Sequence, residues 1–247
     1  MIVTFLTDFG LQDDFVGTCH GVIAGIAPDA RVIDITHGIE PQAVLQGAIA
    51  LRNTLPYMPV GVHLAVVDPG VGSQRRAVAL RTRDGRMFVG PDNGLLTLAA
   101  ADIDAAHELV NFRLEPTSRT FHARDIFSPA AAHLAAGVAI DELGPALDPS
   151  TLAHVDIPER PTVLVIDRFG NVATNLRRDD LPEPGTRVEV GLSHDQYYAV
   201  VANTFADVAP GELILYEDSY GMVTLAISNG NAARLTGAVV GDELRIA

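Results

Sequence analysis

Two aspartates follow short apolar runs, and their positions are the first indication of chemistry in this sequence. Asp8 follows the run Ile2 to Leu6, and Asp68 follows the run Val62 to Val67. Continuous apolar runs are typical of strands that are buried on both faces. Ligands of open α/β sheets bind beyond the carboxyl ends of such strands. We therefore expect both carboxylates to face one crevice, the alternative for each being a turn or cap carboxylate.

A cation and an imidazole are further candidates. A glycine-rich turn after Asp68 leads to the pair Arg75-Arg76, and glycines let backbone approach a ligand closely. His122 precedes a helix that Ser128-Pro129 is predicted to open, and an imidazole in such a loop can titrate near neutrality. A structural role is the commoner one for a lone histidine, so both interpretations stay open here.

The second half of the chain holds groups that suit a nucleobase. Asp167-Arg168-Phe169-Gly170-Asn171 is followed by Thr174-Asn175. Asparagine amides match the edges of a base, and a phenylalanine ring matches its face. A strand-turn-strand with an Asx turn is the plainer interpretation of the same residues, and Asn229-Gly230-Asn231 is an ordinary turn by itself.

The scaffold that would position these residues changes character near residue 155. In the first part, strands and helices alternate, which predicts an α/β domain with a mostly parallel central sheet covered by helices. The later part has short strand patterns separated by turns, which predicts a small all-β, barrel-like domain. We place the two domains at residues 1–157 and 162–247. The predicted strands are 2–6, 31–35, 61–67, 77–81, 87–89, 163–166, 187–190, 197–201, 213–216, 222–227 and 243–246. Helices are predicted at 15–26, at 41–55 and from 128.

Composition excludes several classes of function. The net charge of −14 repels phosphate backbones, so no nucleic-acid partner is expected. All 17 basic residues are arginine, which excludes P-loop, Schiff-base and kinase-type lysines. The single cysteine, Cys19, excludes an internal disulfide and, without a thiol partner, disfavours a structural zinc site. Neither a membrane-spanning run nor a signal peptide is recognisable, so we expect no membrane partner and a cytoplasmic location.

Six segments, ordered along nearly the whole chain, resemble the family of S-adenosylmethionine hydroxide adenosyltransferases, hydrolase relatives of the fluorinase and chlorinase. Each segment is weak alone, but the ordered set is specific. The resemblance implies an α/β N-terminal domain, a β-barrel C-terminal domain and a homotrimer whose active sites lie between neighbouring subunits. The segments are TDFG at 7–10 with Asp13-Asp14, VVDPGVGS at 66–73 with Arg75-Arg76, GPDNGLL at 90–96, FHARDIFSPAAAHLA at 121–135, DRFGN at 167–171 with TN at 174–175, and SNGNAA at 228–233.

The resemblance also implies a reaction and its residues. Hydroxide derived from water would attack C5′ of S-adenosyl-L-methionine and give adenosine and L-methionine, with no cofactor and no metal. Asp68, Arg75 and His122 match the catalytic triad of the hydrolases, and Asp8 matches the residue that holds the ribose hydroxyls. The other substrate-binding positions are, for the methionine end, Asp167, Ser219 and Tyr220, and, for the adenine end, Phe169, Asn171, Phe205, Asn231 and Ala232.

Two alternatives stay open at the level of sequence. One is an S-adenosylmethionine-dependent halogenase that forms a 5′-halo-adenosine, and the other is a non-catalytic protein that binds S-adenosylmethionine or adenosine. Halogenases lack the Asp/Arg/His set and carry an inserted loop after the segment that matches 66–73. Here Arg81 to Arg86 joins two strands tightly, which favours the hydrolase.

Overall fold

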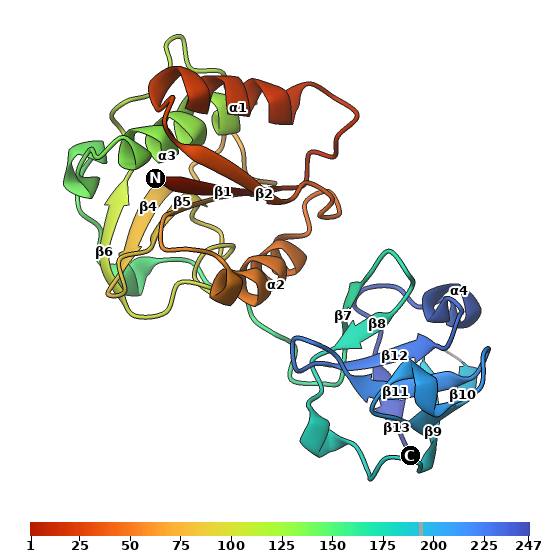
Figure 1. The fold of residues 1–247 in the computed structure, drawn as a ribbon. Helices are drawn as coiled ribbons and strands as arrows, with labels where there is room; N and C mark the ends of the chain where they lie inside the picture. The colour runs from red at the N-terminus through yellow and green to blue at the C-terminus, as the bar shows by residue number, and fades with distance from the viewer. Residues whose placement is uncertain (193–194) are drawn as a thin grey trace. The chain divides into compact units, whose positions relative to one another are not determined.

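The structure is a computed structural model that describes residues 1–192 and 195–247 (Figure 1). The chain divides into two compact units, Met1–Asp156 and Ile157–Ala247. Each unit contains its own β-sheet and its own cluster of buried apolar side chains. Each unit therefore has the core that an independently packed domain requires.

The first unit contains a six-stranded sheet in the order β2-β1-β3-β5-β4-β6. The pairs β1–β2, β1–β3 and β3–β5 are parallel, whereas β4 pairs antiparallel with both β5 and β6. The prediction of a mostly parallel sheet is therefore wrong, because the sheet is mixed. The β4–β5 hairpin turns the chain back, and β6, which the sequence analysis did not predict, adds a second antiparallel pair. The strands are β1 Ile2–Thr7, β2 Arg31–Thr36, β3 Val62–Val66, β4 Ala77–Thr82, β5 Met87–Pro91 and β6 Ile103–Glu108.

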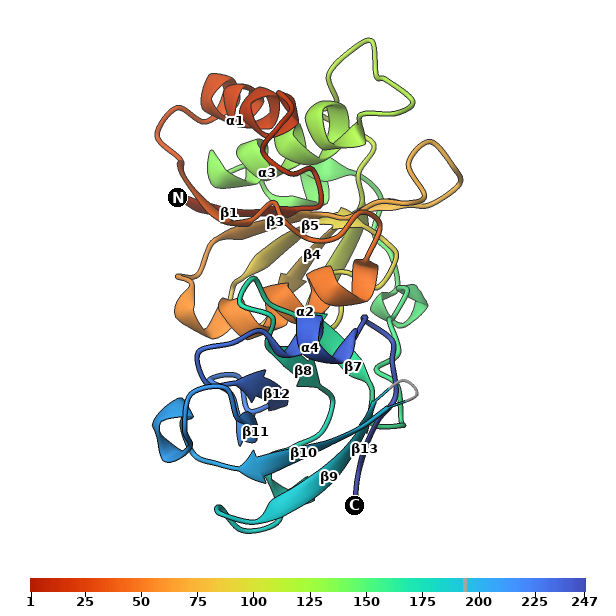
Figure 2. The same cartoon turned by 90° about the vertical axis from the view of Figure 1, so that its right-hand side faces the viewer.

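Helices cover both faces of this sheet, as Figures 1 and 2 show. The helices α1 (Phe15–Ile26) and α3 (Ser128–Ala135) pack together on one face, and α2 (Val44–Thr54) packs on the other. Val16, Cys19 and Ile23 recur at helical spacing on α1, so one stripe of the helix is buried against the sheet. Two layers of apolar side chains result, which explains why β1 and β3 are almost entirely buried.

The parallel pairing of β1 and β3 positions the two candidate aspartates. Thr7 at the end of β1 pairs with Val66 at the end of β3. Asp8 and Asp68 follow these two residues, so both leave the sheet at the same carboxyl edge. This arrangement places them where ligands of α/β sheets bind.

The second unit contains a curled seven-stranded sheet in the order β13-β9-β10-β11-β12-β8-β7. Its two edge strands meet at an antiparallel bridge between Thr162 and Glu243, where the Val163 amide donates to the Asp242 carbonyl over 2.8 Å. A short helix, α4 (Ala232–Thr236), was not predicted. The strands are β7 Val163–Ile166, β8 Val172–Thr174, β9 Arg187–Leu192, β10 Asp195–Val201, β11 Leu213–Glu217, β12 Val223–Ile227 and β13 Leu244–Ile246.

Short helical turns complete the two units. Among the described residues, five are 3-10 turns, and one is a five-residue π-helical turn that runs directly into α3. They are η1 Leu55–Tyr57, η2 (the π turn) Ala123–Phe127, η3 Ile140–Leu143, η4 Pro149–Thr151, η5 Arg178–Asp180 and η6 Phe205–Asp207. Across residues 1–192 and 195–247, none of the helices has the length and apolar character needed to span a bilayer.

Candidate active site

A small pocket at the carboxyl edge of the first sheet brings together three of the predicted residues. Asp8, Asp68 and His122 line a cavity of about 80 Å³. One wall of the pocket is aromatic: the ring of Phe121 lies 6.2 Å from that of Phe9 and 5.2 Å from that of Phe15, centre to centre. The sequence analysis did not select these phenylalanines, although an apolar wall strengthens electrostatic interactions by excluding water.

Arg75 connects Asp68 to His122. Its Nε donates to Asp68 Oδ1 over 3.0 Å, and its Nη2 donates a second, shorter hydrogen bond to Asp68 Oδ2. The same Nη2 lies 3.2 Å from His122 Nδ1. The side chains of Asp68 and Arg75 are only 6% and 9% exposed, so this is a nearly buried, bidentate ion pair.

The environment of His122 keeps its ring neutral. Burial, and then the positive charge of Arg75, lower the pKa of His122, while the charge of Asp68 opposes this shift. Since Arg75 is a donor, Nδ1 is the acceptor in their contact, and the proton of the neutral ring belongs on Nε2. His122 directly precedes the π-helical turn Ala123–Phe127, an irregularity that is frequent at functional sites.

Two neighbouring contacts hold the Asp68–Arg75 pair in place. The side-chain amide of Asn93 donates to the carbonyl of Val67, the residue before Asp68, over 2.9 Å. Arg76 forms an ion pair with Asp92, whose other carboxylate oxygen accepts the Ala153 amide over 2.8 Å. The Pro91–Gly94 segment, which the sequence indicated as a turn, therefore holds Val67 and Arg76, which are the sequence neighbours of Asp68 and Arg75.

Asp8 lines the same pocket. One of its carboxylate oxygens accepts the backbone N–H of Gln42 over 2.8 Å. Gln42 adopts a φ of 68°, a conformation uncommon for a residue other than glycine. The second oxygen of Asp8 accepts no hydrogen bond from the described residues, so it is available to a ligand.

In the second unit, a tight turn gathers most of the predicted base-binding residues. Asp167 Oδ1 accepts the backbone N–H groups of Phe169 and Asn171 over 2.8 and 2.9 Å. This Asx-type turn leaves the Phe169 ring 76% exposed. A Cβ on Gly170, which has a φ of 83°, would lie 2.1 Å from the side chain of Asn231, so glycine is needed for the close approach. Asn231 caps α4, which begins at the buried Ala232.

The other predicted positions lie in turns of that unit, Phe205 in the 3-10 turn η6 and the other two between β11 and β12. The ring of Phe205 packs 5.0 Å from the ring of Tyr216. Ser219 and Tyr220 lie in the β11–β12 turn, where Asp218 Oδ1 accepts the Tyr220 amide over 2.8 Å. Tyr216, which the sequence analysis did not select, contacts Phe205, and burial and then the charges of Asp218 and Asp167 raise its pKa. Tyr216 lies within strand β11, and nothing in the sequence around it marked it as a candidate site residue.

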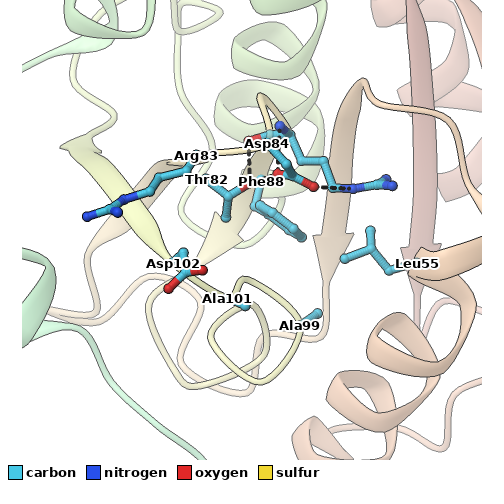
Figure 3. A pocket seen from close by; sticks show the side chains of 9 residues that line it. Leu55, Thr82, Arg83, Asp84, Phe88, Ala99, Ala101 and Asp102 are labelled. Carbon is cyan, nitrogen blue, oxygen red and sulfur yellow. Dashed lines mark hydrogen bonds and ion pairs between the residues drawn. The ribbon is translucent and has the colours of Figure 1, made fainter.

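A larger pocket of about 490 Å³ lies beside the β4–β5 hairpin, at the other end of the sheet (Figure 3). Among its charged residues, Asp84 accepts hydrogen bonds from Thr82 over 2.6 Å and from Arg86 over 2.9 Å. The charges of Asp84 and Arg86 therefore satisfy each other, and the pocket holds none of the predicted site residues. The smaller pocket at Asp8 and Asp68 is therefore the better candidate for chemistry.

Comparisons with known proteins point to one family. The SAM hydroxide adenosyltransferase N-terminal domain matches residues 3–144, and the C-terminal domain of the same name matches residues 161–245. An (R)-S-adenosyl-L-methionine hydrolase from Salinispora tropica is 48% identical, covering 99% of this chain and 97% of its own. A fluorinase from Actinoplanes sp. is 28% identical, and the match covers 91% of this chain and 90% of the fluorinase. The crystal structure of an uncharacterized conserved protein from Thermotoga maritima has a TM-score of 0.92 at 35% identity, and the match covers 99% of this chain and 100% of that protein.

Proposed function

Because this chain belongs to the SAM hydroxide adenosyltransferase family, we propose that it hydrolyses S-adenosyl-L-methionine to adenosine and L-methionine. The Asp68–Arg75–His122 cluster is the observation that carries this function. A hydrolase must make water nucleophilic, and the cluster combines a fixed cation with two proton acceptors. A halide, in contrast, needs no proton acceptor.

The reaction is a displacement at the C5′ carbon of the ribose. A lone pair of the water oxygen forms the new C5′–O bond, and the electrons of the C5′–S bond stay on sulfur. The leaving group is a neutral thioether released from a sulfonium cation, so it needs no general acid. One proton of the water passes to the protein and then to solvent. The energetic difficulty lies in the nucleophile, because free water has a pKa near 15.7.

Arg75 has one N–H free to hold that water. Of its five N–H donors, Nε and both protons of Nη2 point to Asp68 and His122, and one proton of Nη1 goes to the Arg76 carbonyl over 3.0 Å. Within the described part of the chain, the second Nη1 proton forms no hydrogen bond. A guanidinium stays charged at any physiological pH, so it favours the developing hydroxide.

Asp68 orients the water and accepts its proton, either directly or through His122. Each oxygen of the Asp68 carboxylate accepts one bond from Arg75 and keeps a further lone pair. The neutral His122 ring offers a second route for the proton. Asp8, which lines the same pocket, holds the ribose hydroxyls with its open carboxylate oxygen.

A pocket of about 80 Å³ encloses only a fraction of this substrate, since sites for whole ligands measure about 300–1,000 Å³. The second unit provides the remaining contacts: Phe169, Asn171, Phe205, Asn231 and Ala232 for adenine, and Asp167, Ser219 and Tyr220 for methionine. In the arrangement that we propose, the chain is a homotrimer and each site combines the first unit of one subunit with the second unit of its neighbour. Light scattering of the purified protein tests this, and a stable monomer with full activity would contradict it.

Product analysis tests the function itself. The protein is incubated with S-adenosyl-L-methionine, with and without chloride or fluoride, and the products are separated by chromatography. We expect adenosine and methionine in equal amounts and no effect of halide. A 5′-halo-adenosine would indicate a halogenase, and intact substrate bound after long incubation would indicate a binding protein. Supplying the two sulfonium epimers separately shows whether this chain prefers the (R) form named for the relative.

A further inference from the structure

A second cluster of ligand-type side chains lies at the edge strand β2. His20 of α1, Asp34 of β2 and His37, just after β2, place three ligand atoms within 4.8 Å of one another. His20 Nε2 lies 2.9 Å, and His37 Nε2 3.1 Å, from the same oxygen, Asp34 Oδ1. We propose that these three side chains form a binding site for one divalent transition-metal ion of the zinc type.

The buried ring of His37 carries the argument. The side chain of His37 is only 3% exposed, and its Nδ1 lies 2.8 Å from Thr7 Oγ1. Its Nε2 is buried and, within residues 1–192 and 195–247, has no aligned hydrogen-bond partner despite its closeness to Asp34. Leaving a buried polar atom without a partner is unfavourable, because its hydration is lost without replacement. A metal ion on the lone-pair axis of Nε2 would satisfy it.

Asp34 Oδ1 lies against both imidazoles at once. It accepts a hydrogen bond from His20 Nε2 over 2.9 Å, whereas its contact with His37 Nε2 lacks hydrogen-bond alignment. With metal–ligand lengths of about 2.1 Å and tetrahedral angles, the carboxylate oxygen would lie about 3.4 Å from each imidazole nitrogen, close to the 3.1 Å observed for His37. The bond from His37 Nδ1 to Thr7 is the kind of outer contact that fixes the tautomer of a metal-binding histidine.

The donor set selects the class of ion. Two imidazoles and one carboxylate suit zinc and its neighbours, whereas magnesium and calcium prefer oxygen ligands. The two imidazole nitrogens lie within 4.8 Å of each other and must approach to about 3.3 Å to bind tetrahedral zinc. His20 therefore has to move by at most about 1.5 Å. The His20 side chain is 36% exposed and has room to do so. The sequence analysis considered only thiolate ligands for zinc and therefore missed this set.

A metal at this site would stabilise the segment that carries Asp8. The backbone of the same His37 accepts the Gly10 amide over 2.7 Å, and its ring contacts Thr7. His37 thus touches both ends of the segment 7–10, while the three ligands hold α1 to β2. The ion takes no part in the displacement reaction, so its role is structural.

Metal binding by the purified full-length chain tests the site. After chelation and removal of the chelator, zinc is titrated in competition with a chromophoric indicator, and the melting temperature is measured with and without zinc. We expect one tight site per chain and a melting temperature higher by roughly 5 °C at saturation. Cobalt in place of zinc should give visible absorption bands from coordinated imidazole.

Matched variants distinguish this site from other histidines on the surface. Asp34→Asn and His20→Ala, both at partly exposed positions, should weaken zinc binding at least tenfold and abolish the thermal shift. Asp104→Asn, on the opposite edge strand β6, and the exposed His154→Ala should bind zinc like the wild type. No stoichiometric binding, or equal weakening in all four variants, would overturn the proposal. Neither readout depends on hydrolytic activity, so the proposed function is tested separately.

Discussion

Replacing Asp68 with asparagine removes one negative charge from the site and keeps the shape of the side chain. In the wild type, this carboxylate forms two hydrogen bonds with Arg75, and both side chains are nearly buried. At 3.0 Å and an effective dielectric constant of about 20, their attraction is about 5.5 kcal/mol. Leaving a buried charge unpaired lowers the free energy of unfolding by about 3–5 kcal/mol. Asp68→Asn should be destabilised by that amount.

The same substitution should lower kcat by about 100-fold or more, which corresponds to about 2.7 kcal/mol of lost transition-state stabilisation. KM should change much less, because Asp68 acts on the water and not on the substrate. Release of adenosine, measured by chromatography over a range of substrate concentrations, gives both constants.

A double variant separates catalysis from stability. Asp68→Asn combined with Arg75→Met removes both charges, so no unpaired charge is left in the site. Its free energy of unfolding should return toward the wild-type value, while its turnover stays as low as that of the single variant. The reasoning is wrong if the single variant keeps turnover within about threefold of the wild type. It is equally wrong if turnover recovers together with stability in the double variant.

Four further predictions address other parts of the chain. The buried ring of His63 has a pKa lowered to about 4, by burial first and by Arg86 second. The unfolded chain then binds the proton more readily, so the free energy of unfolding should fall by roughly 3 kcal/mol as pH decreases from about 6.5 to about 4. Urea titrations of the wild type and of His63→Gln, which should lose this pH dependence, measure the effect. Asp8→Asn should raise KM about tenfold with a small change in kcat, because it removes a contact to the ribose that persists through the reaction; an unchanged KM contradicts that role. Phe169→Ala should also raise KM but leave the melting temperature unchanged, since the ring is 76% exposed; equal loss of stability would indicate a structural role instead. EDTA should leave kcat unchanged at a temperature where the chain stays folded, because every proposed step uses side chains of the protein; a kcat that falls with EDTA in the Asp34→Asn variant, whose structural site is already disabled, and returns with added metal would refute this.

Features encoded in short stretches of sequence were accessible without a structure. The apolar runs before Asp8 and Asp68 predicted two buried strands, and the pairing of Thr7 with Val66 brings their ends to one edge. Asp68 and Arg75 are seven residues apart across a glycine-rich turn, so their contact depends on local geometry. The mixture of parallel and antiparallel strand pairs in the first sheet was harder to predict from the sequence. The strand β6 (Ile103–Glu108) is polar and only partly buried, so it lacks the apolar run that revealed β1 and β3.

Features assembled from distant segments could not be predicted from spacing alone. His122 lies 47 residues from Arg75 along the chain, and only the packing of the π-helical turn against the sheet brings the two side chains together. The same holds for His20, Asp34 and His37, which come from a helix, a strand and a loop. Nothing in the sequence between them marks them as neighbours, so the cluster appears only when the fold is known.

The charges in the pocket explain how one site can bind a sulfonium cation beside an arginine. The carboxylates of Asp8 and Asp68 contribute two negative charges, and Arg75 contributes one positive charge. With a neutral His122, the pocket carries a net charge of −1, which attracts the cationic substrate. Protonation of His122 would cancel that charge and also remove a proton acceptor. Burial and Arg75 lower the pKa of His122, so in the proposed mechanism the arginine that would polarise the water also keeps the imidazole ready to receive the proton. When the C5′–S bond breaks, sulfur becomes neutral, and the attraction that held the methionine end at this pocket disappears with the charge.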